Sequence, residues 1–446
     1  MHGGLILTNP EFSGCQSLIH LIQKANNIEL IANTGTGILF RLTVSNNNSI
    51  YANASGIKVN SFIIKIVIIT DVIFEYGLGN RIGRNAKRTE TFTDVLNESR
   101  VQQQIWIDCF EQGLPEFTPS VANLSIFDNA QSRNFLNLLR RQFEILYPRE
   151  RFHTPDGGKL IPNIIEILTN GSLIYNQPPN IGVLLMPDIR NTITLKECLR
   201  SNVILNKLNA YENTIVNILR LYLFHDIIHL DLHTENVLIS NDDYASSFII
   251  DFGYITNSGS NNNSKKRKLS KRDIDVDNFN NMNNNNTDIE KIKFVEGIIQ
   301  FVQDINIAKH NENHENDSSE NHEAYRGIKW INDIDSNNKG NIFLNAFNKL
   351  KYIDTHRNKN QYLNGNIFKL NDDKIKTYYC TIEGQKKEPP KQKPQVSNDN
   401  PFSNEKCQNN SFCTISGGKR RTYVSKRKRK HKTQKNKKQE TRKTKR

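Results

Sequence analysis

Two short apolar stretches, each interrupted or followed by acidic or amide side chains, constrain the fold of this 446-residue chain more than any other feature. The first reads IIHLDLHTENVLI and carries Asp231 and Asn236. The second reads FIIDFG and carries Asp251, fifteen residues after Asn236. Apolar, β-branched stretches of this length favour strands, and the turn NDDYASS between them favours a hairpin. The pattern therefore predicts a hairpin whose ends carry two carboxylates and one amide.

These three side chains have the chemistry that transfer of the γ-phosphoryl group of ATP requires. A carboxylate must orient the acceptor hydroxyl and take its proton, while Mg²⁺ neutralises the phosphate charge. Magnesium takes oxygen ligands and few of them from protein, which one Asp and one Asn can supply. We therefore expect Asp231 to be the base and Asn236 and Asp251 to bind Mg²⁺. The alternative is that Asp, Asn and Gly stand here only because they favour turns.

The pattern H-x-D-x-x-x-x-N from His229 to Asn236, followed by D-F-G at Asp251, resembles the catalytic and metal-binding loops of the protein-kinase-like superfamily. The resemblance implies an α+β, bilobal fold, with a small antiparallel β N-lobe that carries one helix and a mostly helical C-lobe. It also implies ATP and Mg²⁺ as cofactors and a kinase reaction on a hydroxyl acceptor.

A lysine upstream fits the same resemblance. Lys65 lies within FIIKIVII, an apolar run that predicts a well-covered strand. The resemblance places a phosphate-contacting lysine there, paired with an acid on the following helix, which we expect at residues 93–110. Glu98 is the expected partner, with Glu111 and Asp108 as alternatives. Lys65 could instead be a solvent-facing residue of an edge strand, and Glu98 an ordinary acid of the first turns.

Two further segments are expected to hold the nucleotide. Gly35 and Gly37 keep two glycines of the G-x-G-x-x-G pattern within the hairpin expected at residues 28–44, where backbone N–H groups could approach phosphates. A lone G-x-G between strands can also be a simple hairpin turn. The hinge between the lobes is expected at Met186 to Asp188, whose backbone would bond the edge of the adenine.

The sequence constrains the substrate that accepts the phosphoryl group less than it constrains the phosphoryl donor, ATP. After Asp231 the loop reads Leu-His rather than the Leu-Lys of protein serine/threonine kinases, and this form is similar to the aminoglycoside and choline kinase-like branch. A protein serine/threonine kinase is the first prediction, a small-molecule phosphotransferase the second, and a pseudokinase binding module the third. His233 could contact phosphate or brace the loop, and His229 is expected to brace it.

Composition divides the chain into packed and unpacked segments. Residues 1–27 are expected to form an N-terminal extension, residues 28–186 the N-lobe with insertions, and residues 187–382 the C-lobe. Residues 257–287 are expected to be a disordered insert and residues 383–446 a disordered tail, because such polar compositions cannot bury enough apolar surface. Apolar periodicity predicts helices at 16–25, 93–110, 133–145, 195–200, 210–224, 289–305 and 342–353, and strands at 62–69, 182–189, 237–239 and 248–250.

The net charge of +14 is concentrated in the tail. From Lys419 to Arg446, sixteen Lys or Arg stand against one acid, Glu440, so the other 418 residues sum to −1. Such a tail could bind nucleic acid or a nuclear import receptor, or remain a solvated terminus. Its sequence GGKRRTYVSKRKRKHK resembles endings of kinase-like proteins of large DNA viruses.

Cysteine usage and hydropathy bear on the compartment. The six cysteines are scattered, with no CxxC and no zinc-ligand spacing, and they do not mark a secreted disulfide scaffold. The N-terminus lacks the charged and apolar regions of a signal peptide, and no apolar stretch is long enough to span a bilayer. We therefore expect an intracellular protein with no membrane partner, in the host cytoplasm or nucleus if it is viral.

Overall fold

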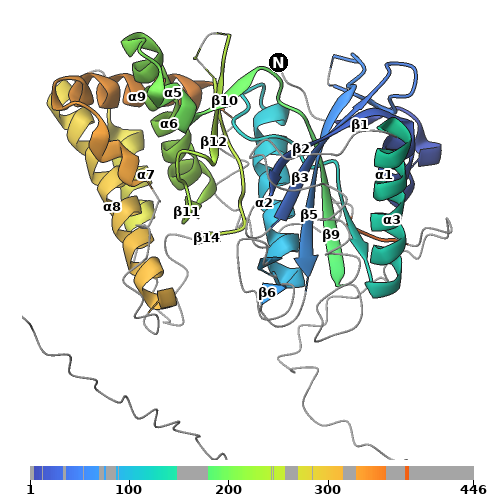
Figure 1. Ribbon diagram of the computed structural model, residues 1–446. Helices are drawn as coiled ribbons and strands as arrows, with labels where there is room; N and C mark the ends of the chain where they lie inside the picture. The colour runs from blue at the N-terminus through green and yellow to red at the C-terminus, as the bar shows by residue number, and fades with distance from the viewer. Residues whose placement is uncertain are drawn as a thin grey trace, which may run out of the picture. The chain divides into compact units, whose positions relative to one another are not determined.

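The computed structural model shows an α+β protein, as expected from the sequence, with a mostly antiparallel sheet and a set of helices (Figure 1). No helix in the described part of the chain has the length and apolar character needed to cross a membrane. The expected tail lies outside the described residues. The structure describes residues 5–12, 14–33, 37–53, 55–69, 75–76, 87–88, 90–147, 179–242, 244, 246–256, 270–283, 285–314, 328–357 and 377–380.

The main sheet has six strands in the order β15-β8-β9-β5-β3-β2. Neighbouring strands pair antiparallel, except that β15 runs parallel to β8. The strand β5 is interior, and its β-branched residues other than the partly buried Ile63 are buried on both faces, as its apolar run predicted. The strands are β2 (Ala25–Asn33), β3 (Gly37–Val44), β5 (Ser61–Ile69), β8 (Asn123–Phe127), β9 (Asn180–Pro187) and β15 (Thr377–Tyr379).

Helices cover both faces of this sheet (Figure 1). The helix α2 (Phe92–Glu111) packs on one face, where Val95 joins Val67 and Leu184 in an apolar cluster. The helices α1 (Cys15–Lys24) and α3 (Asn129–Leu146) pack on the other face, in a second cluster with residues of β2, β3, β5 and β9. We call the sheet with these three helices the sheet region.

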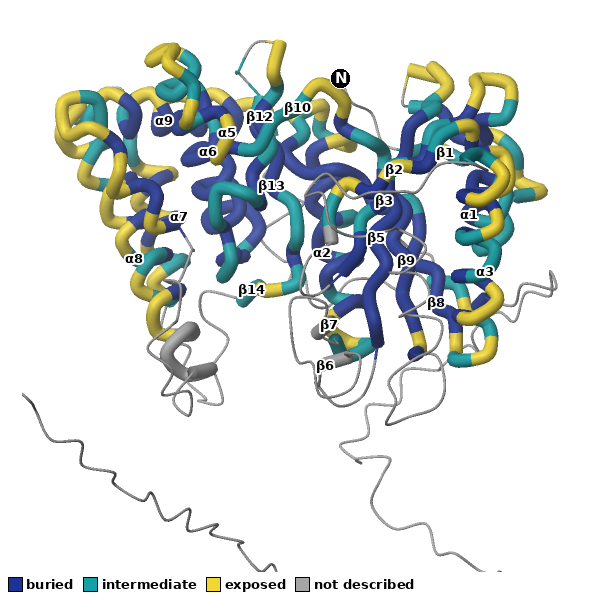
Figure 2. Tube along the Cα trace, in the orientation of Figure 1, coloured by how far each residue is buried: buried dark blue, intermediate teal, exposed yellow. Residues whose placement is uncertain are grey.

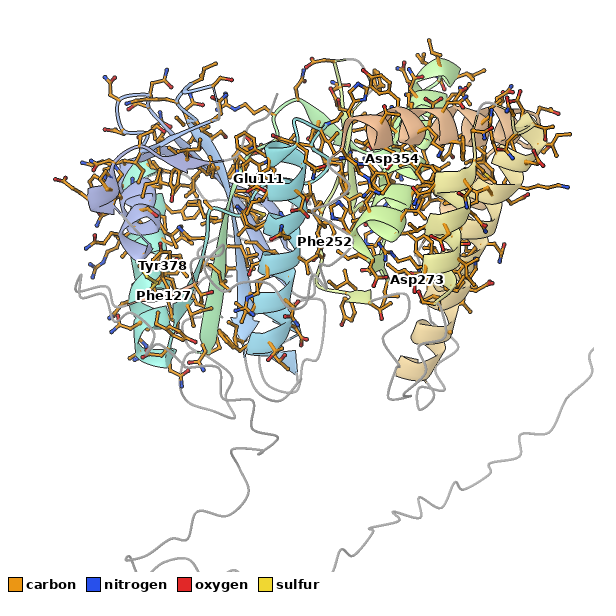
Figure 3. All side chains as sticks on the ribbon, turned by 180° about the vertical axis from the view of Figure 1, so that it is seen from behind. Glu111, Phe127, Phe252, Asp273, Asp354 and Tyr378 are labelled. Carbon is orange, nitrogen blue, oxygen red and sulfur yellow. A yellow bond between two sulfur atoms is a disulfide. The ribbon has the colours of Figure 1, made fainter. Side chains whose placement is uncertain are left out.

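Two expected boundaries differ from the structure. The segment expected as an N-terminal extension contributes α1 to the core, with Leu18 and Leu21 fully buried. Residues 377–380, expected in the C-lobe, instead add β15 to the edge of the sheet, and Cys380 forms a disulfide with Cys15. Tyr378, labelled in Figure 3, packs against the backbone at the start of α1. Sequence reasoning missed both, because the partners of these segments are far away along the chain.

The remaining helices form the helical region, centred on α6 (Ile204–His225). From Ala210 onward α6 is buried almost all round, whereas α8 and α9 expose their outer sides (Figure 2). The other helices of this region are α5 (Leu195–Arg200), α7 (Lys271–Asn281), α8 (Asp288–His314), the 3₁₀ helix η2 (Lys329–Asp333) and α9 (Ser336–His356).

The expectation of a disordered insert at 257–287 is wrong for α7, while residues 257–269 lie outside the described part of the chain. Ser270 begins α7 with a capping box, and Val276 and Phe279 bury one side of the helix. Arg272 donates to two carbonyls near the end of α6, those of Tyr222 and Leu223. A cap and two apolar residues at helical spacing are enough here because α6 supplies the packing surface.

Short strands connect the two regions and frame the motifs found in the sequence. The hairpin predicted around NDDYASS is present, with Val237 paired to Ile249. It consists of β12 (Val237–Ser240) and β13 (Ser247–Ile249), with β10 (Thr192–Thr194) beside β12, while β11 (Ile228–His229) pairs with β14 (Ile255–Thr256). The first motif thus lies between β11 and β12, and D-F-G lies between β13 and β14. The other short elements are β1 (Ile6–Leu7), η1 (Pro10–Phe12), β4 (Tyr51–Ala52), β6 (Glu75–Tyr76) and β7 (Lys87–Arg88).

Candidate functional site

Lys65 joins three separate elements of the structure. It lies on β5 between Leu39 of β3 and Leu184 of β9, and only 5% of the residue is exposed. Its Nζ donates to Glu98 Oε1 at 2.6 Å and to Asp251 Oδ1 at 2.7 Å. The predicted pairing of Lys65 with Glu98 is confirmed, and the alternative of a solvent-facing edge lysine is excluded.

The other two acids considered as partners have different positions on α2. Asp108 accepts a hydrogen bond from Gln104 one turn earlier on α2, and its Oδ2 lies 3.5 Å from Nδ1 of the buried His225. Glu111 is the last residue of α2, thirteen positions after Glu98. Glu98 is two turns into the helix, at the level of Lys65.

The charges of this cluster support one another. Burial by itself would lower the pKa of Lys65, but the carboxylates of Asp251 and Glu98 outweigh it and hold that pKa above its ordinary value. Burial would likewise raise the pKa of Asp251, yet the Lys65 ammonium holds it below the usual value. Lys65 and Asp251 are therefore both charged at neutral pH, and their pairing offsets the cost of taking an ammonium out of water.

Asp251 occupies an uncommon backbone conformation. Its φ is +64°, in the left-handed region that few non-glycine residues adopt. The next residue, Phe252, is buried between α2 and the helical region (Figure 3), and its ring lies 5.3 Å from that of His229. With Phe252 anchored, the backbone turn brings Asp251 to Lys65 while leaving 37% of its side chain exposed. Such local strain is common at functional sites.

Asp231 is held through its backbone, and its side chain remains open. Its N–H donates to Nδ1 of His229 at 3.2 Å, and its carbonyl accepts from Nδ2 of Asn236 at 2.9 Å. The N–H of Ile250 donates to the carbonyl of Asn236 at 3.1 Å, which ties this loop to the segment that carries Asp251. The Asp231 side chain is 45% exposed, so its carboxylate can meet a substrate.

His229 braces the loop, as expected. Because its Nδ1 accepts from Asp231, Nε2 carries the proton and donates to the carbonyl of Ile250 at 3.2 Å. Burial lowers the pKa of His229 to about 4, which keeps the ring neutral near pH 7. The neutral ring can thus accept on one side and donate on the other, which a doubly protonated ring could not do.

His233 also has a bracing contact, on the other side of Asp231. Its Nδ1 accepts from the N–H of Glu235 at 3.2 Å, and its Nε2 lies 3.8 Å from Asp231 Oδ2. The bracing role is therefore present, and contact with phosphate stays a prediction.

Sequence reasoning missed Trp330, whose Nε1 donates to the carbonyl of Leu232 at 3.0 Å and supports the loop from η2. Its only sequence signal was that the chain has just two tryptophans.

The structure describes some, but not all, of the residues expected to hold the nucleotide. Gly35 lies outside the described residues. Gly37 begins β3 beside Lys65, and a Cβ there would lie 3.2 Å from the carbonyl of Ile66 and 3.6 Å from the Lys65 side chain. A side chain at Gly37 would therefore press against the carbonyl of Ile66 and come into ordinary contact with the lysine. Met186 is buried, with its sulfur 3.3 Å from Nε2 of Gln102 on α2.

The expected role of Asp188 needs a correction. Its N–H donates to the carbonyl of Ser61 at 3.1 Å, so it is not available to an adenine. Its carboxylate accepts from Ser61 Oγ at 2.8 Å and from Arg41 Nε at 3.0 Å. These bonds tie the end of β9 to β5 and β3, and they give Asp188 a structural role that its position after an apolar strand did not reveal.

The described residues could supply two oxygen ligands to Mg²⁺, which takes few ligands from protein. They do not form a cluster that could hold a metal ion by side chains alone. No group of three or more His, Cys, Asp or Glu within the described ranges is arranged to hold a metal ion. Asp251 offers an ionised, partly exposed carboxylate, and Asn236 offers an amide whose NH₂ group is already engaged. Two such ligands, completed by water and phosphate oxygens, would suit a magnesium ion.

No protein-family model matches this chain, and no curated protein matches its sequence.

Proposed function

We propose that this protein is an ATP- and Mg²⁺-dependent phosphotransferase of the protein-kinase-like class. The sheet region would be the N-lobe of a bilobal fold, and the helical region would be the C-lobe. The observation that carries the proposal is the position of Lys65, whose Nζ bonds at once to Glu98 of α2 and to Asp251 of the D-F-G segment. Three segments far apart in sequence thus converge with the charges that a phosphate and its metal need.

Each residue has a distinct task in the proposed reaction. Lys65 would bind phosphate oxygens, with Glu98 fixing its position, while Asp251 and Asn236 would hold Mg²⁺. When bound, MgATP would supply the γ-phosphoryl group to the acceptor oxygen, and ADP would leave as the bond between the γ-phosphorus and the bridging oxygen breaks. Asp231 would orient the acceptor hydroxyl and take its proton, and the exposure of its carboxylate supports this assignment.

The more specific proposal is a protein serine/threonine kinase. It is supported by the helix α2, which packs on the sheet and carries Glu98 to Lys65, as the protein-kinase resemblance implies. A small-molecule alcohol is the second candidate, supported by His233 next to Asp231, where protein serine/threonine kinases carry lysine. A pseudokinase module is a weaker proposal, because Lys65, Asp231, Asn236 and Asp251 are all present.

Phosphate transfer from γ-labelled ATP tests the proposal. The full-length protein is incubated with Mg²⁺ and generic protein substrates, then with a panel of small alcohols, with Asp251→Asn as the matched inactive control. Label on serine or threonine supports the protein kinase, and label on an alcohol alone supports the second candidate. ATP binding without turnover on any acceptor would favour the binding module and contradict the enzyme.

A further inference from the structure

The strand β15 is a short segment that joins the edge of the main sheet after the chain has left the helical region. Its three residues, Thr377–Tyr379, pair in parallel with β8, and the N–H of Cys380 donates to the carbonyl of Ile126 at 2.8 Å. This length is at the short end of the range for strands, so its own backbone bonds stabilise it little. The attachment of β15 to the sheet therefore depends on its other contacts.

A disulfide bond is the strongest of these contacts. Cys380, which is 4% exposed, is bonded to Cys15, the first residue of α1, across 365 positions of sequence. Beside it, the ring of Tyr378 packs against Gly14, where a Cβ would overlap the ring (Figure 3). The disulfide closes a loop that contains almost the whole described chain, and it holds β15 on the sheet even where the backbone bonds are weak.

The attached strand supports α2 by two routes. The ring of Tyr379 stacks on that of Phe92, the first residue of α2, with 6.2 Å between the ring centroids and 29° between the planes. The strand β8, which pairs with β15, places Leu124 in the apolar cluster that also contains Val95 of α2. The position of β15 thus affects the first turns of the helix that carries Glu98.

The other cysteines that the structure describes are unsuited to thiol–disulfide exchange. Cys109 and Cys198 are free and buried, and burial raises the pKa of both thiols, that of Cys109 to about 11. A thiol of such a high pKa stays protonated near neutral pH and is a poor nucleophile. Cys15 is only partly buried, so a small thiolate can approach its sulfur. Among the described cysteines, the bonded pair is therefore the group that can respond to a change in redox conditions.

We propose that the Cys15–Cys380 disulfide is a redox-controlled clamp, which holds β15 against β8 and α2 and so sets how firmly Glu98 positions Lys65. To open it, the thiolate of a small thiol such as glutathione attacks the sulfur of Cys15, a new S–S bond forms, and Cys380 leaves as a thiolate. A second glutathione thiolate attacks the glutathione sulfur of this mixed disulfide and releases the thiolate of Cys15. The net reaction converts the protein disulfide and two glutathione thiols into two protein thiols and glutathione disulfide. The reverse reaction closes the clamp.

Opening the clamp should loosen the start of α2 without unfolding the sheet region. Apart from Cys380 and Tyr378, the apolar clusters under α1, α2 and α3 are formed by residues outside β15. A looser first turn of α2 would let Glu98 hold Lys65 less firmly, and the KM for ATP should rise. The role of Lys65 in this inference rests on the proposed phosphotransferase function.

A redox titration of the full chain tests the clamp. The parent protein carries Cys407→Ser and Cys413→Ser, which remove the two cysteines outside the described residues. It is equilibrated with reduced glutathione or with glutathione disulfide, and its thiols are counted by alkylation and mass spectrometry. The double variant Cys15→Ser with Cys380→Ser represents the open clamp under both conditions.

Two aromatic substitutions separate the stacking contact from the disulfide itself. Tyr379→Ala keeps the disulfide and removes the ring that stacks on Phe92. Tyr352→Ala is the matched control, because this tyrosine of α9 is also exposed, at 69%, and its ring also contacts a neighbouring ring, that of His356.

Hydrogen exchange and thermal unfolding give readouts that need no catalysis. Reduction should speed exchange of the amides in β15 and in the first two turns of α2 by about tenfold or more, and leave the amides of α6 unchanged. It should also lower the midpoint of thermal unfolding by about 5–10 °C, as loss of a disulfide that closes a long loop implies. The double serine variant should behave like the reduced parent in either buffer.

The kinetic readout is the KM for ATP in the two buffers. Reduction should raise the KM of the parent about threefold, to the value of the double serine variant, which should not respond to redox conditions. Tyr379→Ala should raise the KM about twofold with the disulfide intact, and Tyr352→Ala should follow the parent. Equal exchange of α2 in both redox states, or an equal KM in both, would overturn the proposal. Redox-dependent exchange of α2 without ATP turnover under any condition would support the clamp and refute only the phosphotransferase.

Discussion

The candidate site has a buried half and an open half, and the two halves hold their charges differently. Lys65 and Glu98 keep only 6% and 2% of their side chains exposed. Asp231 keeps 45% exposed and Asp251 keeps 37%. A buried charge is tolerated only with a close partner, whereas a hydrated carboxylate needs none. Removal of a charge should therefore affect stability and activity together in the buried half, and mainly activity in the open half, where Asp251 alone also pairs with Lys65.

The division also suits the proposed chemistry. Lys65 is positioned before any ligand binds, because Glu98 fixes it from α2. The carboxylates that would meet metal and acceptor stay at the surface, where a ligand can reach them without a further opening of the core. The bonds of His229 and Asn236 to the backbone of Asp231 keep this open half ordered without burying its carboxylate.

The largest effect on activity is expected from Asp251→Asn. Loss of the main metal carboxylate should lower Mg²⁺-dependent turnover by roughly 10³-fold or more, since a bound metal contributes several kcal/mol to such reactions. The free energy of unfolding should also fall, because Asp251 is one of the two carboxylates that stabilise the buried Lys65 ammonium, but it should fall less than in Lys65→Met because Glu98 still pairs with Lys65. Turnover and thermal unfolding of the same preparation check this. Wild-type turnover in Mg²⁺ would show that the metal assignment is wrong.

Asp231→Asn should lower kcat by about 10²–10⁴-fold, the usual contribution of a general base. The KM for ATP should stay within about twofold, because this carboxylate acts on the acceptor and not on the nucleotide. Stability should be unchanged for a side chain so exposed. Steady-state kinetics with varied ATP make the comparison, and a variant with weak ATP binding but normal kcat would contradict the role.

The open half could be predicted from sequence because it is local. Asp231, Asn236 and Asp251 lie within 21 residues, on a hairpin whose strands are clear from their apolar runs. The pairing of Lys65 with Glu98 could also be predicted, because the strand and the helix that carry these residues are consecutive large elements of the chain. The long periodic helices and the strands β5 and β9 were predicted for the same reason, because their burial pattern repeats along a single segment.

The parts that could not be predicted depend on contacts between distant segments. The disulfide between Cys15 and Cys380 spans 365 positions, and neither cysteine has a neighbour in sequence that marks it. The strand β8 is only NLSIF, too short and too polar for a clear pattern. Tertiary packing decided each of these features.

The buried half should respond differently from the open half when its lysine is removed. Lys65→Met leaves the carboxylate of Glu98 buried without its counter-charge, which should cost about 3–5 kcal/mol of unfolding free energy. It should also raise the KM for ATP and lower kcat. Adding Glu98→Gln should recover much of the stability but not the activity, with a coupling of about 1–3 kcal/mol between the two sites. Chemical denaturation of the four proteins measures this cycle, and strict additivity would show that the two side chains do not depend on each other.

The smallest effect is expected from an exposed ion pair beside the same loop. Lys196 Nζ lies 2.6 Å from Glu235 Oε1, with 44% and 40% of their side chains exposed, and Glu235 directly precedes Asn236. Exposed pairs of this kind contribute about 0–1 kcal/mol, because water and salt screen them. Glu235→Gln should therefore change kcat by less than about twofold and the unfolding free energy by less than about 1 kcal/mol. The N–H of Glu235 that bonds to His233 is kept, so the loop should hold its shape.

A tenfold loss of kcat with normal stability would mean that exposure alone does not make a charge near this loop dispensable. In that case Glu235 would have to be counted with the open half, among the residues that act on the acceptor. A loss of clearly more than about 1 kcal/mol of unfolding free energy would instead contradict the division into two halves, because an exposed charge would then affect stability.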